Sequence, residues 1–286
     1  MRLSIATVVI LTAWFASAPL TEPSELRLPD GDASLIRQTR DLRLNVDYLK
    51  GYASDARSIF TSPFSFQPSG WLKFSFITVI TTAVANEEDD IQNWVQENRN
   101  ASSDRIAGFV KPFGDGKYTL PTLAGLYCYG HFFQSERARR TALIGLESFV
   151  FTGILTETIK RTSHKHRPRS EDLEGVRWDG PRFSNANLSF PSGHTSSAFA
   201  VATVVASEYG DNAFVPPLMY GAATLCAFSR INDNAHWASD VIMGAAIGHF
   251  VAKEIIVLHG GKTDKKFSLL PVATDGRPGL SILYRF

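Results

Sequence analysis

Long apolar segments of helical length constrain the fold of this chain more than any other feature of its sequence. Their length and pattern are those of helices rather than strands. Hydrophobic residues make up 44% of the chain, which is enough for a sizeable buried core. The sequence therefore predicts an all-α fold, a helical bundle. The segments are Phe74 to Val84, Tyr118 to Phe133, Thr141 to Ile159, Ser196 to Ala206, Phe214 to Phe228 and Ala238 to Leu258.

Charged residues interrupt several of these segments. The run between Lys73 and Glu87 and the run between Glu147 and Glu157 are both shorter than the ~20 apolar residues that a membrane-spanning helix needs. Because a charge in the middle of a membrane is costly, the sequence favours a soluble bundle. A multi-spanning membrane protein is the alternative.

The N-terminus has the form of a secretory signal peptide. A basic start is followed by the apolar run Leu3 to Phe15 and the small residues Ala16-Ser17-Ala18. Pro19 would hinder cleavage, so an uncleaved anchor is the alternative. We expect a signal peptide at 1–20, an exposed lead-in at 21–40, and an exported protein that is periplasmic or associated with the cell envelope.

The C-terminus differs in kind from the rest of the chain. Short, partly alternating runs flank Asp275-Gly276-Arg277-Pro278-Gly279, and these turn residues predict a short β-hairpin. We therefore divide the remainder into a helical domain at 41–262, with its catalytic core at 141–258, and a hairpin tail at 263–286.

The overall charge is nearly balanced, with 29 basic and 28 acidic residues. This balance argues against a nucleic-acid partner, and any selectivity for anions must be local. Cys128 and Cys226 lie in separate apolar segments, and we expect two buried thiols, with a disulfide between them as the alternative. The acidic run Glu87-Glu88-Asp89-Asp90 predicts a solvated turn or the start of a helix.

A first group of candidate functional residues directly follows the apolar segment Thr141 to Ile159. Lys160 is followed by Arg167 and Pro168. Lysine supplies a point charge, and arginine supplies a planar fork of donors that matches two phosphate oxygens. Taken alone, the basic cluster around Lys165 could simply satisfy the end of a helix.

A second group, Phe190-Pro191-Ser192-Gly193-His194-Thr195, directly precedes another apolar helix. Glycine lets backbone N–H groups approach an anion, and the N-terminus of the helix adds unpaired donors. Ser192 offers a hydroxyl, and His194 is suited to protonate a leaving alkoxide. A plain helix-capping turn is the alternative.

A third group contains Ser229, Arg230, His236 and Asp240. His236 and Asp240 are four residues apart, so on a helix they share one face. A carboxylate in that place holds the imidazole in one tautomer and leaves its other nitrogen free to attack phosphorus. A structural His–Asp pair is the alternative, and the nearby Arg230 argues against it.

The three groups together resemble the three-part signature of the type-2 phosphatidic acid phosphatase and vanadium haloperoxidase superfamily. The resemblance spans roughly Thr141 to Leu258 and implies a helical bundle of that type, with a metal-free active site. It assigns phosphate binding to Lys160, Arg167, Ser192, Gly193 and Arg230, proton donation to His194, nucleophilic attack to His236 and orientation of His236 to Asp240. The matched positions are Lys160, Arg167, Pro168, Pro191, Ser192, Gly193, His194, Ser229, Arg230, His236 and Asp240.

From this resemblance we expect a phosphatase that hydrolyses phosphate monoesters, chiefly lipid phosphates of the envelope, through a phosphohistidine and without a metal or other cofactor. The expected partner is a phosphorylated lipid or a small phosphomonoester, and membrane association is compatible with it. The alternatives are a vanadate-dependent haloperoxidase and a non-catalytic envelope lipid-binding protein. Trp178, Phe183 and Trp237 lie near the groups in sequence, and we expect them in the core rather than against a lipid chain.

Overall fold

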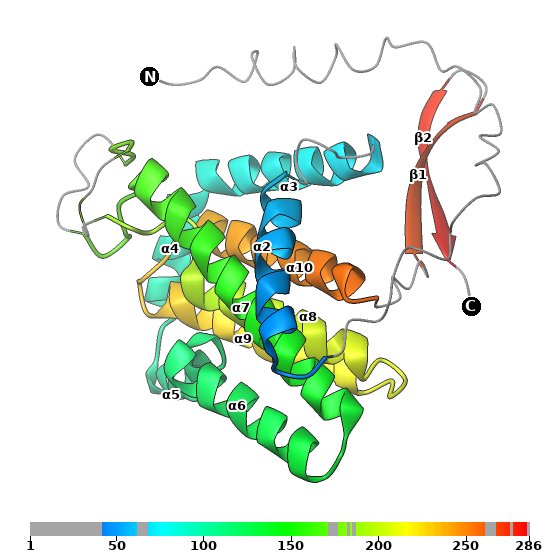
Figure 1. Cartoon of the computed structure of the whole chain (residues 1–286). Helices are drawn as coiled ribbons and strands as arrows, with labels where there is room; N and C mark the ends of the chain where they lie inside the picture. Colours follow the sequence, from blue (N-terminus) through cyan, green and yellow to red (C-terminus); the bar gives the residue numbers. More distant parts are fainter. Residues whose placement is uncertain are drawn as a thin grey trace. The chain divides into compact units, whose positions relative to one another are not determined.

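The computed structural model describes residues 42–61, 68–170, 177–181, 184, 187–260, 267–274 and 277–284. The expected signal peptide and lead-in at 1–40 lie outside the described residues. The helices are α2 (Val46–Thr61), α3 (Pro68–Asn86), α4 (Glu88–Glu97), α5 (Ala101–Val110), the short 3-10 helix η3 (Lys111–Gly114), α6 (Gly116–Phe132), α7 (Glu136–Ser163), α8 (Gly193–Glu208), α9 (Val215–Asn232) and α10 (Ala238–Leu258) (Figure 1).

The predicted all-α class is confirmed by these helices, which account for most of the described chain. Two short strands, β1 (Phe267–Thr274) and β2 (Arg277–Tyr284), pair antiparallel near the C-terminus. Their register sets Phe267 opposite Tyr284 and Thr274 opposite Arg277. The strands lie within the expected tail at 263–286.

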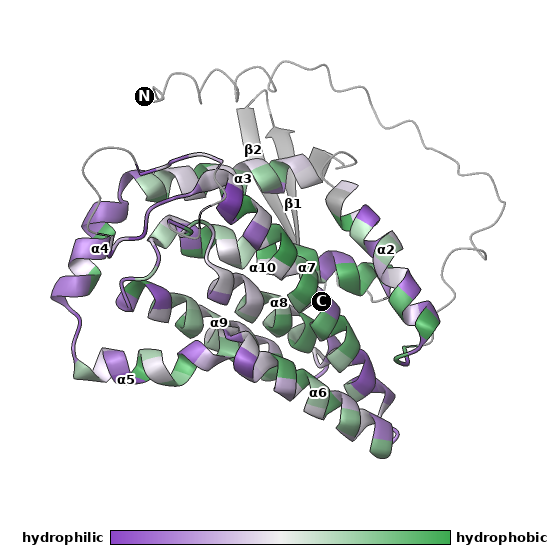
Figure 2. Ribbon diagram, turned by 60° about the vertical axis from the view of Figure 1, so that its left-hand side comes forward, coloured by the Kyte–Doolittle hydropathy of each residue, from purple (hydrophilic) through white to green (hydrophobic). Residues whose placement is uncertain are grey.

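The core of the bundle forms where α8 packs between α7 and α10. Ala200 and Val204 of α8 are fully buried, and they share a hydrophobic cluster with Ile144 of α7 and with Ala252 and Ile255 of α10. Apolar residues recur along these helices (Figure 2). Burial of this apolar surface stabilises the arrangement by roughly 25 cal/mol for each Å² removed from water.

Two glycines of α10 allow α8 to approach closely. A Cβ atom added to Gly248 would lie 2.1 Å from the carbonyl oxygen of Ser196, and one added to Gly244 would lie 2.7 Å from the carbonyl oxygen of Ser192. Any larger residue would therefore have to push the backbone of α8 away. This contact brings the N-terminus of α8 next to the first turns of α10.

The end of α7 turns the chain back toward the bundle. The helix begins after its N-cap Ser135, whose side chain accepts a hydrogen bond from the Ala138 N–H. It ends at its C-cap His164, which is in the left-handed region at φ 42°. A left-handed residue ends a helix because it breaks the helical path of the backbone. The segment after α7 therefore folds back, and Lys165 forms a bridge with Trp178.

Two of the described helices, α7 and α10, are long and apolar enough to cross a membrane, judged by length and composition alone. The core helices of a soluble protein pass the same test, and α7 and α10 are core helices here. This observation is compatible with the integral-membrane alternative as well as with the favoured soluble bundle.

The expectation of two buried thiols is half correct. Cys226 of α9 is buried, but Cys128 is exposed, and both thiols are free. Cys128 lies on the outward face of α6, whereas neighbouring Leu123 and Gly130 of the same helix are buried. An apolar sequence segment does not reveal which of its faces packs inward.

Substitution of Gly248 tests the α8–α10 contact. We expect Gly248→Ala to lower the free energy of unfolding by about 1–3 kcal/mol, the usual cost of overpacking a tight core, because the new methyl group meets backbone atoms. Chemical denaturation measures the loss. Gly221→Ala is the matched control, since a Cβ on Gly221 of α9 meets nothing within 4 Å. Equal stability of the two variants would contradict the close contact.

Candidate active site

Four helix ends carry the residues that the sequence singled out. Lys160 lies in the last turn of α7 and Arg230 in the last turn of α9. Gly193 and His194 begin α8, directly after its N-cap Ser192. His236 precedes α10, and Asp240 lies in the first turn of that helix. Arg167 follows α7 in the returning segment.

The structure brings these residues near one another, and three of them line one small cavity. A Cβ on Gly193 would lie 3.9 Å from Cε of Lys160, so the start of α8 touches the lysine. A cavity of about 180 Å³ opens over Lys160, Gly193 and His194. The charges of Lys160 and Arg167 act on His236, and that of Arg230 acts on His194. All of the predicted site residues therefore belong to one neighbourhood.

Two polar groups of the site have no hydrogen-bond partner among the described residues. They are Nε2 of His194 and Nε of Arg230, and both atoms are buried. Buried polar groups are normally paired, so an unpaired cluster of this kind suits a bound polar ligand. Arg230 also donates from Nη1 to Asp233 at 2.8 Å, which fixes the direction of its side chain.

His194 and His236 are both neutral imidazoles at pH 7. Burial, with the added charge of Arg230, lowers the pKa of His194 to about 4. Burial also lowers the pKa of His236 to about 4, although the hydrogen bond and charge of Asp240 oppose this shift. A neutral imidazole has a lone pair available for attack.

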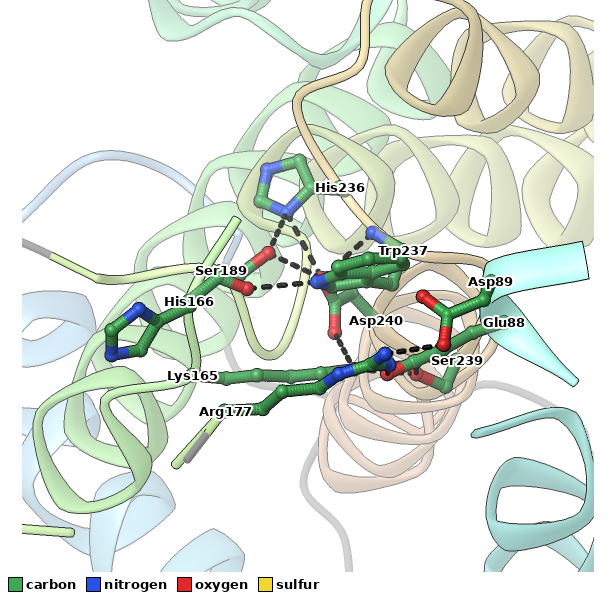
Figure 3. A network of polar contacts seen from close by, with 10 residues as sticks. All are labelled: Glu88, Asp89, Lys165, His166, Arg177, Ser189, His236, Trp237, Ser239 and Asp240. Carbon is green, nitrogen blue, oxygen red and sulfur yellow. Dashed lines mark hydrogen bonds and ion pairs between the residues drawn. The ribbon is translucent and has the colours of Figure 1, made fainter. Parts of the chain in front are cut away.

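Asp240 lies directly behind His236 (Figure 3). Its Oδ2 is 3.5 Å from Nδ1 of His236, and it accepts hydrogen bonds from the Trp237 N–H at 3.0 Å and from the Ser189 hydroxyl. The predicted His–Asp contact is therefore present, and Nδ1 is the ring nitrogen that faces the carboxylate. The other nitrogen, Nε2, lies on the side of the ring away from the carboxylate and is available to react.

A buried lysine also binds Asp240, and sequence reasoning missed it. Lys165 is 0% exposed and donates to Oδ1 of Asp240 at 3.0 Å and to Oε2 of Glu88 at 2.7 Å. Arg177 donates to the other oxygen of Glu88 at 3.0 Å and also to Asp89 (Figure 3). The interpretation of Lys165 as part of a basic helix end is wrong.

Glu88 corrects a second expectation. It begins α4, as one of the two readings of the acidic run predicted, but it is 3% exposed and not solvated. Its partner Lys165 is 77 residues away along the chain, so no local sequence signal could have paired them. The lysine and the carboxylate are buried together because each compensates the charge of the other.

The aromatic residues near the site fall into different environments. Trp237 is in the core, as expected, and its indole N–H donates to the His166 carbonyl at 2.8 Å. Trp178 is 44% exposed, so its expected place in the core is wrong; its ring lies 5.1 Å from Nζ of Lys165. Phe183 lies outside the described residues.

A separate cluster of Asp55, Glu147 and His259 could hold a metal ion, since its ligand atoms lie within 4.8 Å of one another. These side chains already bind each other: Nε2 of His259 and Oε2 of Glu147 are 2.7 Å apart, and the Tyr48 hydroxyl donates to the same oxygen at 3.0 Å. Glu147 lies about 20 Å along α7 from Lys160, at 1.5 Å per residue. The cluster is therefore remote from the phosphate-binding candidates.

The candidate site residues lie in the part of the chain that matches a known protein family. Residues 141–264 match the sequence model of the PAP2 superfamily. The core of this chain belongs to the PAP2 superfamily. This result confirms the resemblance on which the sequence analysis relied.

Three relatives are similar to this chain over different lengths. A lipid A 1-phosphatase from Rhizobium etli is 28% identical over 227 residues, which are 74% of this chain and 93% of that protein. A lipid A 1-phosphatase from Porphyromonas gingivalis is 47% identical over 66 residues, 23% of this chain but only 15% of that protein. A decaprenylphosphoryl-5-phosphoribose phosphatase from Mycobacterium tuberculosis is 32% identical over 130 residues, 44% of this chain and 66% of that protein.

A solved structure has a similar fold. A transmembrane PAP2-type phosphatidylglycerolphosphate phosphatase from Bacillus subtilis superposes with a TM-score of 0.51 at 20% identity, covering 65% of this chain and 92% of that one. At this identity the likeness concerns the fold, and it agrees with the helical class found here.

The charge of Lys160 makes oxyanion binding dependent on pH. Burial, and then the charge of Arg167, lower the pKa of Lys160 to about 8, so the ammonium is present below that pH and lost above it. We expect the affinity for tungstate, a dianion throughout this range, to fall as the pH rises through about 8. Titration of tungstate by calorimetry between neutral and alkaline pH measures this.

Lys160→Arg is the comparison variant, because a guanidinium keeps its charge at these pH values. Its affinity for tungstate should be lower than that of the wild type at neutral pH but should show no fall near pH 8. A fall of the same size in both proteins would mean that another group is responsible.

Proposed function

We propose that this chain is a phosphatase that hydrolyses phosphate monoesters of lipids through a phosphohistidine on His236. The observation that carries the proposal is the convergence of Lys160, Arg167 and Arg230 on two neutral imidazoles, His194 and His236, with a buried carboxylate behind the second. Three cations suit a phosphoryl group, whose charge is spread over its equatorial oxygens. The proposal requires neither a metal nor another cofactor.

In the first step, Nε2 of His236 attacks the phosphorus and the bond to the leaving alkoxide breaks. The proton on Nδ1 stays between His236 and Asp240, so the carboxylate stabilises the positive charge that the imidazole gains. His194 gives a proton to the departing oxygen. In the empty site the pKa of His194 is about 4, and a bound phosphate dianion raises it by offsetting the nearby cations.

In the second step, water attacks the phosphorus and the P–N bond breaks. His194 takes the proton of the water, and His236 returns to its neutral form. Inorganic phosphate leaves, so atoms and charges balance over the two steps. Proton transfer by a positioned residue contributes about 10²–10⁴ to the rate of such a step.

A groove beside the site supports a substrate with a hydrocarbon chain. The groove has a volume of about 490 Å³, and Phe149, Val150 and Ile154 of α7 contribute its apolar wall. It shares Phe149, Gly153 and Glu157 with the cavity at Lys160, so the two are adjacent. A phosphate at Lys160 and a chain along α7 would therefore belong to one molecule. The names of the relatives, which act on lipid A and on a decaprenylphosphoryl compound, support the same class.

We also propose that the protein meets this substrate at a membrane of the cell envelope. Large apolar side chains are exposed on α3, α6 and α9, including Trp71, Phe76, Phe132, Leu218 and Phe228. Exposed apolar surface of this extent is typical of contact with a membrane or another protein. Export to the periplasm accords with the N-terminal sequence.

The nucleophile is tested with His236→Ala in the purified full chain. We expect phosphate release from phosphatidic acid, a polyprenyl phosphate and p-nitrophenyl phosphate to fall at least about 10⁴-fold, the scale seen when a covalent nucleophile is removed, while tungstate binding persists. Release assays in the presence of a chelator measure turnover. Alkaline quenching followed by mass spectrometry detects a phosphohistidine in the wild type.

His194→Ala is the control for this experiment. It keeps the nucleophile, so it should still form the phosphohistidine with p-nitrophenyl phosphate, whose leaving group needs no proton. Near-normal turnover in His236→Ala would refute the mechanism. Bromide oxidation that depends on added vanadate would instead identify a haloperoxidase, and lipid binding without any phosphate release would identify a non-catalytic protein.

The groove is tested with Gly153→Leu. A Cβ on Gly153 meets nothing within 4 Å, so the leucine fits on the helix but fills the groove. We expect kcat/KM for long-chain phosphatidic acid to fall roughly tenfold or more, the scale of losing a few buried methylenes, with no change for p-nitrophenyl phosphate. Gly221→Leu, at an equally open position on α9, should change neither value. Equal effects on both substrates would contradict a chain-binding role.

A further inference from the structure

We propose that Lys165 and Glu88 are positioning residues, a buried ion pair that holds the Asp240 carboxylate ionised and correctly oriented behind His236. This role rests on the proposed function of His236 as the nucleophile. Neither residue is one of the matched sequence positions. Lys165 lies between Lys160 and Arg167 in the chain, whereas Glu88 reaches the site only through the tertiary fold (Figure 3).

Both oxygens of Asp240 are held by donors other than the histidine. Oδ1 accepts from Lys165 at 3.0 Å, and Oδ2 accepts from the Trp237 N–H at 3.0 Å and from the Ser189 hydroxyl. With these three donors the plane of the carboxylate is set, and Oδ2 faces Nδ1 of His236. Without the hydrogen bond from Lys165, Oδ1 would no longer be held, and the plane of the carboxylate could rotate.

Lys165 is itself held in place. It donates to Glu88 at 2.7 Å and to the Ser239 hydroxyl at 2.8 Å, and Ser239 in turn donates to the same oxygen of Glu88 at 2.7 Å. Its ammonium lies 5.1 Å from the ring centre of Trp178 and 5.7 Å from that of Trp237. Such cation–π contacts help to hold the ammonium group in its place.

The charges of this network compensate one another. Lys165 lies between two buried carboxylates, Glu88 and Asp240, and Arg177 supplies a second positive charge on the outer side of Glu88. A buried charge that loses its partner is strongly destabilised. Lys165 therefore compensates the charge of both buried carboxylates, and Arg177 adds to this at Glu88.

Asp240 is also influenced by the groups that bind phosphate. Burial raises its pKa, but the hydrogen bond from His236 and the charge of Lys165 outweigh burial, so the pKa of Asp240 stays below its usual range. Without Lys165, the buried carboxylates of Glu88 and Asp240 would face each other with no cation between them, and their repulsion would favour protonation of Asp240. The titratable and charged groups that face Asp240 are His236, Lys165, Lys160, Arg167 and, through Lys165, Glu88.

The test compares Lys165→Met with the double variant Lys165→Met/Glu88→Gln, using the full chain and p-nitrophenyl phosphate. In Lys165→Met we expect kcat to fall about 10–100-fold, the scale on which residues that orient a reactive group act, with KM little changed. The acidic limb of the kcat profile should move to higher pH, because protonated Asp240 no longer accepts from His236. The double variant should restore the limb toward its wild-type position, since only one carboxylate is left.

Asp89→Asn is the matched control, because Asp89 binds Arg177 on the outside of the network and does not touch Lys165 or Asp240. It should leave kcat and the pH profile unchanged. Thermal unfolding of every variant separates a loss of fold from a loss of positioning. A folded Lys165→Met protein with the wild-type kcat and pH profile would overturn the proposal.

If Lys165→Met does not fold, the double variant carries the test, because it leaves no second carboxylate uncompensated beside Asp240. We expect it to fold and to retain a kcat roughly tenfold below that of the wild type, through the lost orienting donor. A wild-type kcat in the folded double variant would overturn the proposal. Failure of the proposed function is recognised separately, by a wild-type protein that releases no phosphate or by a His236→Ala variant that remains active.

Discussion

Buried positive charge governs this structure. Several cationic side chains end inside the bundle or at its helix ends. The charge of each needs a partner, either an acceptor of the protein or an anionic ligand. Lys165 has two carboxylates and a hydroxyl around it. Among the described residues, Lys160 donates to the carbonyl of Leu188 alone, at 2.7 Å, and burial, together with the charge of Arg167, lowers its pKa. Lys165, whose charge is compensated within the protein, has a structural role. Lys160, whose charge is poorly compensated, favours an oxyanion beside it.

The positions of these charges depend on how closely the helices pack. Gly244 and Gly248 bring the start of α8 against α10, so that the Ser192 N–H donates to the carbonyl of Asp240 at 3.0 Å. The turn that presents Gly193 and the turn that presents Asp240 are thereby joined through the backbone. The geometry of the site is a consequence of this helix–helix contact, because the reactive groups lie on helix ends.

The site and the groove along α7 suit the two ends of an amphiphile. Lys160, Gly193 and His194 line part of the cavity at Lys160, and the groove begins at Phe149 and Gly153, which line both spaces. An exposed glycine at the junction leaves open space where any other residue would place a side chain. The same helix therefore carries Lys160 in its last turn and an apolar surface one to three turns earlier.

Residue types and spacing indicated the candidate site of this protein, and the fold decided how the charges are compensated. Lys160, Arg167, His194, Arg230, His236 and Asp240 were all identifiable as candidates from sequence, because a phosphate site needs cations and imidazoles and these residue types stand in three short groups. The all-α class followed from the apolar periodicity for the same local reason. The burial of Lys165 and Glu88 and the exposure of Cys128 were not identifiable, because they depend on which faces of distant helices meet. Only tertiary packing determines that, since a charge becomes costly, and needs a partner, once water has been excluded around it.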